Sequence, residues 1–75
     1  MRIYSVADLH WRDHELHLKT GRLLATIEPD VTYPKMWRVR LPNGHLTDMV
    51  NKSRAKDAAI SLALTALNQS NAKAA

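Results

Sequence analysis

Three histidines near the amino-terminal end have a spacing that could hold a metal ion. His10, His14 and His17 form the pattern His-x3-His-x2-His, which on a helix would gather three imidazoles on one face, as a zinc site requires. The residues around them alternate between apolar and polar, which predicts a strand from about His14. Strand geometry puts His14 and His17 on opposite faces, so the sequence favours surface histidines and no metal site.

Basic side chains form the second group with chemical potential. The net charge of +4 divides into −1 for residues 1–34, +4 for residues 35–57 and +1 for residues 58–75. Within the middle segment, two arginines are expected on one sheet face, and a cluster is expected at a helix start, where free backbone N–H groups suit phosphate or carboxylate. The candidate residues for nucleic-acid or anion binding are Arg38, Arg40, Lys52, Ser53, Arg54 and Lys56.

The same cations also have a structural interpretation. The arginines can pair across strands with Glu15, Glu28 or Asp48, and lysines at helix starts are common on solvated surfaces. Both interpretations remain open at this stage.

Catalytic patterns are missing from the sequence. It has no cysteine, no nucleophile motif and no glycine-rich phosphate loop, and its carboxylates are scattered. A chain of 75 residues also has a thin core, because a domain of this size buries only about 60–65% of its unfolded surface. We therefore expect no enzyme, no cofactor and no small-molecule substrate.

The candidate residues must be positioned by a small sheet. Period-two alternation predicts strands over residues 11–18, 22–28, 36–41 and 45–50, with turns at Thr20-Gly21 and at Pro42-Asn43-Gly44. In the second strand the alternation places three apolar side chains on one face, namely Leu23, Ala25 and Ile27.

The last hairpin has two possible registers. A two-residue turn pairs Leu41 with Leu46 and Trp37 with Val50, whereas a three-residue loop pairs Arg38 with Asp48 and Trp37 with Met49. We favour the first register, with a bulge near Asp48.

One helix follows the sheet. Ser53 is a natural N-cap, and apolar residues then recur at helical spacing, which predicts a helix over residues 53–68 with a narrow polar stripe of Asp57, Ser61, Thr65 and Asn68. Residues 58–72 carry no charged side chain, so the apolar arc is wider than a small sheet needs. We expect the surplus to form an oligomer interface that includes Ile60, Leu64 and Leu67.

The predicted fold is a single α+β domain over residues 1–75, with a three- to four-stranded antiparallel sheet and one carboxy-terminal helix packed on one face. It divides into an amino-terminal segment (1–10), the sheet (11–50), the helix (53–68) and a frayed tail (70–75). No run of eighteen apolar residues occurs, and residues 1–12 lack a secretory signal core, so we expect a cytoplasmic protein without membrane contact.

Two resemblances add expectations. In topology, residues 16–67 resemble the three-stranded DNA-binding domains of the AP2 and integrase amino-terminal type. The stretch LPNGHLTDMVNKSRAKDAA at 41–59, with Trp37 just before it, resembles short uncharacterised proteins of rhizobial-type alphaproteobacteria. The second resemblance implies a bacterial, cytoplasmic protein and no particular activity.

The sequence as a whole favours a small non-catalytic interaction module that self-associates, as a homodimer. The alternative is a nucleic-acid-binding protein that uses the basic sheet face and the basic helix start.

Overall fold

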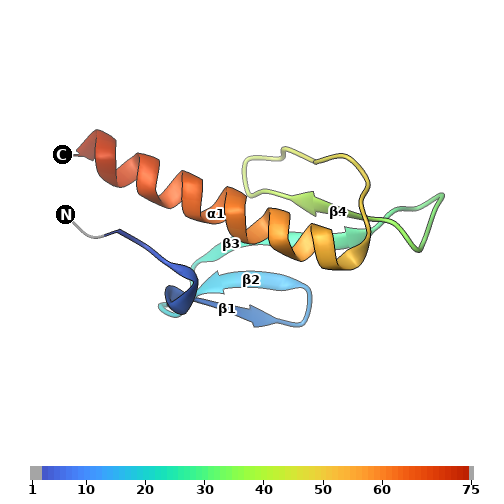
Figure 1. The fold of residues 1–75 in the computed structure, drawn as a ribbon, viewed down its shortest axis with the longest axis horizontal. Coiled ribbons are helices and arrows are strands. Elements are labelled where there is room, and N and C mark those ends of the chain that lie inside the picture. The colour runs from blue at the N-terminus through green and yellow to red at the C-terminus, as the bar shows by residue number, and fades with distance from the viewer. Residues whose placement is uncertain (1–2, 75) are drawn as a thin grey trace.

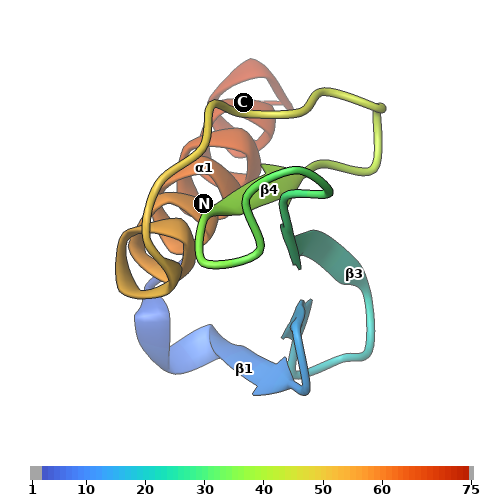
Figure 2. The same cartoon turned by 90° about the vertical axis from the view of Figure 1, so that its right-hand side faces the viewer.

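The computed structural model of the protein describes the backbone of residues 3–74 and the side chains of residues 3–69. A short 3-10 helix, Val6–Asp8, precedes a four-stranded antiparallel sheet with the order β1-β2-β3-β4. The strands are β1 (Leu9–Arg12), β2 (Glu15–Leu18), β3 (Leu23–Pro29) and β4 (Trp37–Arg40), and the helix α1 spans Lys52–Ala74. Helix α1 lies across one face of the sheet, as Figures 1 and 2 show, which confirms the predicted α+β class.

The first hairpin corrects the prediction of one long strand over residues 11–18. A tight turn at Asp13 and His14 divides that stretch, because Asp13 adopts the left-handed conformation, with φ of 56°, that aspartate tolerates better than most residues. Strand β1 therefore begins at Leu9, inside the segment predicted to lie outside the sheet, and Leu9 pairs with Leu18.

Strand β3 contains a bulge that alternation did not predict. Leu16 pairs with Ala25 and His17 pairs with Leu23, so Leu24 is an extra residue between the two pairs. Leu24 and Ala25 are consequently both buried, and Leu23, predicted on the same face as Ala25 and Ile27, is 39% exposed. The prediction that Leu23 shares a face with Ala25 and Ile27 is wrong because the bulge changes the phase of the strand.

The segment after β4 runs beside it without forming a regular strand. Trp37 pairs with Val50, as predicted, but Leu46 pairs with Arg40 and not with Leu41. The N–H of Thr47 donates to the carbonyl of Val39, so the segment has one more residue than β4 between these two contact points. The irregularity falls at Asp48 and Met49, where a bulge was predicted. On the turn side of it the pairing follows the register of the three-residue loop, and at Trp37 it follows the register of the two-residue turn.

Helix α1 is longer than predicted at both ends. The side chain of Asn51, and not that of Ser53, caps it by accepting a hydrogen bond of 2.9 Å from the N–H of Arg54. The helix continues to Ala74, so the predicted tail is wrong up to that residue, and Ala75 lies outside the described residues.

The core lies between α1 and the inner sheet face. Its helical side is a ridge of one residue per turn, with three alanines that allow the helix to approach the sheet closely: Ala55, Ala59, Ala63 and Leu67. Its sheet side contains the three largest fully buried side chains, Leu16, Ile27 and Val39. In the described part of the chain, no helix has the length and apolar character needed to cross a membrane.

Candidate functional site

The arginines of the predicted nucleic-acid face are paired with carboxylates. On the outer sheet face, Arg40 donates two hydrogen bonds to the two carboxylate oxygens of Glu28, at 2.8 and 3.2 Å. Arg38 donates through Nε to Asp30 Oδ1 at 2.9 Å, and through a terminal nitrogen to the carbonyl of Thr47 at 3.0 Å. Glu28 is one of the partners that the structural interpretation named, whereas Asp30 was not foreseen.

These pairs also affect the acids. The hydrogen bond from Arg40 lowers the pKa of Glu28 below its ordinary value. The hydrogen bond from Arg38 is the main cause of the lowered pKa of Asp30, followed by the backbone N–H of Tyr33. Both acids are therefore ionised at neutral pH and offset the charges of Arg38 and Arg40.

The basic helix start has a different arrangement. Lys52 places its Nζ 4.8 Å from the ring centre of Trp37, and Lys56 places its Nζ 5.3 Å from that of Trp11. These are cation–π contacts, one helical turn apart. Ser53 and Arg54 are exposed. The structure therefore separates the six predicted binding residues into two arginines paired with carboxylates on the sheet and four residues at the helix start, none of which has a carboxylate partner among the described residues.

The histidines do not gather. His10 and His17 are cross-strand neighbours with ring centres 5.7 Å apart, while His14 lies at the β1–β2 turn with its ring against Trp37, 4.8 Å away. His17 Nε2 lies 3.1 Å from Glu15 Oε1. Among the described residues, no group of three or more side chains has the arrangement of a metal site.

One side of α1 is covered by the amino-terminal part of the chain. The side chain of Asn68 accepts a hydrogen bond of 2.8 Å from the N–H of Tyr4 and donates one of 3.2 Å to its carbonyl. Lys56, three turns earlier on the same side, contacts Trp11. We name this side the covered flank, and its residues are Lys56, Ile60, Leu64 and Asn68.

The predicted interface residues are wholly or partly buried within the chain. Ile60 and Leu64 are half-buried and pack against the core, between the two contacts of the covered flank. Leu67 belongs to the core itself and is only 7% exposed. The predicted surplus of apolar surface is thus largely used within the chain on this side.

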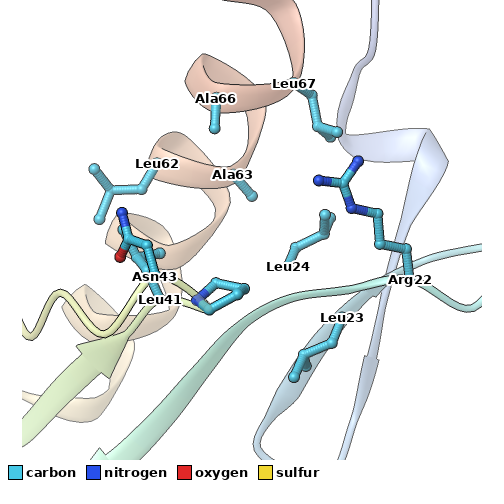
Figure 3. A pocket seen from close by; sticks show the side chains of 10 residues that line it. Arg22, Leu23, Leu24, Leu41, Asn43, Leu62, Ala63, Ala66 and Leu67 are labelled. Carbon is cyan, nitrogen blue, oxygen red and sulfur yellow. The ribbon is translucent and has the colours of Figure 1, made fainter. Parts of the chain in front are cut away.

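The opposite side of α1 borders an apolar groove. We name this side the open flank; its residues are Ala58, Leu62 and Ala66. The groove has a volume of about 250 Å³ and lies between the helix, the start of β3 and the segment just after β4 (Figure 3). It is lined by Arg22, Leu23, Leu24, Leu41, Pro42, Asn43, Leu62, Ala63, Ala66 and Leu67. Ala66 and Leu23 are exposed, and Leu62 and Leu41 are half-buried.

The chemistry of the groove is that of a contact surface. Arg22 is the only charged residue among its described lining residues, so the groove has no acid–base pair. Sequence reasoning missed this site because it assigned Leu24 to the outer face, whereas the bulge directs Leu24 into the groove. The adjacent leucines at 23 and 24 were the one available signal, since two neighbouring apolar residues leave the phase of a strand open.

The comparisons with known proteins identify no relative of this chain. No protein-family model matches the sequence, and the searches of curated proteins and of solved structures give no match. The resemblances noted from the sequence stay predictions.

Proposed function

We propose that the protein is a small non-catalytic interaction module that self-associates through the apolar groove. The observation that supports the proposal is the open flank of α1, where the half-buried Leu62 and the exposed Ala66 border an apolar groove that the described part of the chain leaves open. The core is small, with three large side chains fully buried, so covering additional apolar surface would stabilise the folded state.

The test is the mass of the protein in solution as a function of concentration. Sedimentation equilibrium up to roughly 1 mM should show a mass that rises above that of one chain. Ala66→Glu places a carboxylate in the groove at an exposed helical position, and this variant should keep the mass of one chain. Thr65→Glu is the matched control, because it adds the same charge on the exposed stripe next door and should behave like the wild type.

Two results would contradict the proposal. A wild-type protein that keeps the mass of one chain at the highest concentration does not self-associate. Equal loss of association in the Ala66 and Thr65 variants would indicate a general effect of charge and not a contact at the groove.

The second candidate function is nucleic-acid binding by the helix start. It is supported by the three cations Lys52, Arg54 and Lys56, which have no ion-pair partner among the described residues. Because Arg38 and Arg40 are paired, the binding surface would be smaller than the six residues predicted. Affinity for duplex DNA should then fall steeply between low and moderate salt, and Arg54→Gln should weaken it while Arg40→Gln should not. Absence of binding at low salt excludes this function.

A further inference from the structure

The loop between β3 and β4, residues 30–36, is held in one shape by its own hydrogen bonds. Asp30 Oδ2 accepts from the N–H groups of Thr32 and Tyr33, each at 3.0 Å, and the N–H of Asp30 donates to the carbonyl of Met36 at 2.7 Å. The N–H of Met36 donates to the carbonyl of Tyr33 at 2.8 Å, and Arg38 fixes the second oxygen of Asp30. The β3–β4 loop is therefore preorganised.

This rigid loop presents apolar side chains to water. Val31 is 98% exposed, the largest exposed fraction among the large apolar residues described, and Tyr33 is 58% exposed. Neither side chain contributes much burial to the single chain, although ordering a loop has an entropic cost. A preorganised apolar tip is what a docking contact needs, because little further order is lost on binding.

The loop and the apolar groove lie at opposite ends of the sheet. The loop joins the end of β3 to the start of β4, while the groove is formed at the start of β3 and just beyond the end of β4. The two ends are far apart along the longest axis of the molecule, whose extents are 43 × 21 × 17 Å (Figure 1). The loop therefore cannot fill the groove of its own chain, but it can fill that of a second copy.

We infer that the β3–β4 loop of one copy docks into the apolar groove of another, with Val31 and Tyr33 as the inserted side chains. The inference rests on the proposed function, since it names the partner surface for the self-association. Each copy uses one end as the donor and the other as the acceptor, so the contact is heterologous and joins copies head to tail. A tip of two side chains buries far less than the roughly 1,200 Å² of the smallest stable interfaces, so the association should be weak and reversible.

The head-to-tail contact has a specific signature in solution. The wild-type mass should rise past that of two chains as concentration increases, because each added copy exposes a new loop and a new groove. A closed two-fold dimer, with groove against groove, would instead level off at two chains.

Mixing two defective variants tests the pairing directly. Val31→Asp retains the groove, and Ala66→Glu retains the loop, so each should remain a single chain by itself. The mixture should form a one-to-one pair that grows no further, because only one complementary contact is left. Val31→Ser leaves the net charge unchanged and should weaken association at least about tenfold, as expected for loss of an apolar anchor. Ser61→Asp adds the same charge as Val31→Asp on the exposed helix stripe and is the control for that variant. The amide protons of Thr32 and Tyr33 should keep their protection from exchange in the Val31 variants, which checks that the loop is intact.

Each outcome separates the inference from the function on which it rests. If Val31→Asp still associates while Ala66→Glu does not, the groove is an interface and the loop is not its partner, so the inference is wrong and the proposed function stands. The inference is also wrong if both variants are single chains and their mixture does not pair. A wild type that never exceeds the mass of one chain overturns both.

Discussion

Helix α1 has partly buried apolar side chains on both flanks, but the amino-terminal part of the chain contacts both ends of the covered flank, whereas the open flank borders a groove. On the covered flank, Trp11 and Tyr4 contact the first and last residues of the row, and Ile60 and Leu64 are half-buried between them. On the open flank, Leu62 and Ala66 border a groove. The difference shows that the width of an apolar arc indicates how much surface needs a partner, but not on which side that partner lies.

The largest expected effect distinguishes the flanks by one substitution on each. Leu64→Glu puts a charge on the covered flank and should lower the free energy of unfolding by about 2 kcal/mol. Leu62→Glu, on the open flank, should lower it by less than about 1 kcal/mol while abolishing self-association. Urea denaturation at micromolar concentration, where the chains are separate, measures both values. Equal destabilisation by the two variants would show that the flanks do not differ.

The next effect concerns how the covered flank is closed. Asn68→Ala removes both hydrogen bonds to Tyr4 and should lower the free energy of unfolding by about 1–2 kcal/mol. Amide exchange at Tyr4 should also become faster. Gln69→Ala removes the neighbouring exposed amide and should change neither quantity. If Asn68→Ala leaves amide exchange at Tyr4 unchanged, the amino-terminal segment is not held by this side chain.

A smaller effect tests the cation–π contact that closes the other end of the covered flank. Lys56→Gln loses an interaction of about 0.5–1 kcal/mol with Trp11, offset by a few tenths from removing a cation at the positive end of the helix dipole. Arg54→Gln removes an exposed cation from the same turn and should raise the free energy of unfolding by those few tenths of a kcal/mol. The two variants should therefore shift the thermal midpoint in opposite directions, and a shift of the same sign would rule out a stabilising contact between Lys56 and Trp11.

The smallest expected effect concerns the two arginine–carboxylate pairs, which lie on neither flank of α1. The pKa values of Glu28 and Asp30 are lowered from 4.5 and 3.8 in the folded protein, so the unfolded chain binds protons more readily. The stability from the two arginine pairs is thus fully present above about pH 5 and is lost as the pH falls through the folded pKa values, which lie below 4.5 and 3.8. Denaturation curves between pH 6 and pH 2.5 should show a shallower decline for the double variant Glu28→Gln and Asp30→Asn. An unchanged decline would place the acid sensitivity in other carboxylates.

The sequence allowed prediction of features that depend on local patterns. Alternation located β2, most of β3 and β4, and helical spacing located α1, because each pattern reflects one continuous buried face. The pairing of Trp37 with Val50 was predicted and is present, although beside the turn Arg40 pairs with Leu46, so the favoured register is wrong there. The candidate cations were also assigned correctly to a sheet face and to a helix start.

The features that could not be predicted depend on single residues or on distant contacts. Asn51 is as good an N-cap as Ser53, and spacing alone does not choose between them. The bulge at Leu24 is hidden because its neighbours are apolar on both sides. The contact between Asn68 and Tyr4 joins residues 64 positions apart, and no local pattern reports it. The apolar groove could not be predicted either, because Leu24 lines it and the position of Leu24 depends on the bulge.

The segment beside β4 has a consequence for aggregation. Along that edge, the N–H groups of Trp37, Val39 and Leu41 donate to Val50, to the hydroxyl of Thr47 and to His45. Their carbonyls accept from the N–H groups of Val50, Thr47 and Gly44. No backbone group at these three positions remains for an added strand, so fibril-like growth cannot start there. The opposite edge is β1, which is only four residues long and carries His10 and Arg12. Strand β1 is therefore the regular strand with an uncovered edge among the described strands, and strand addition to the sheet should occur there.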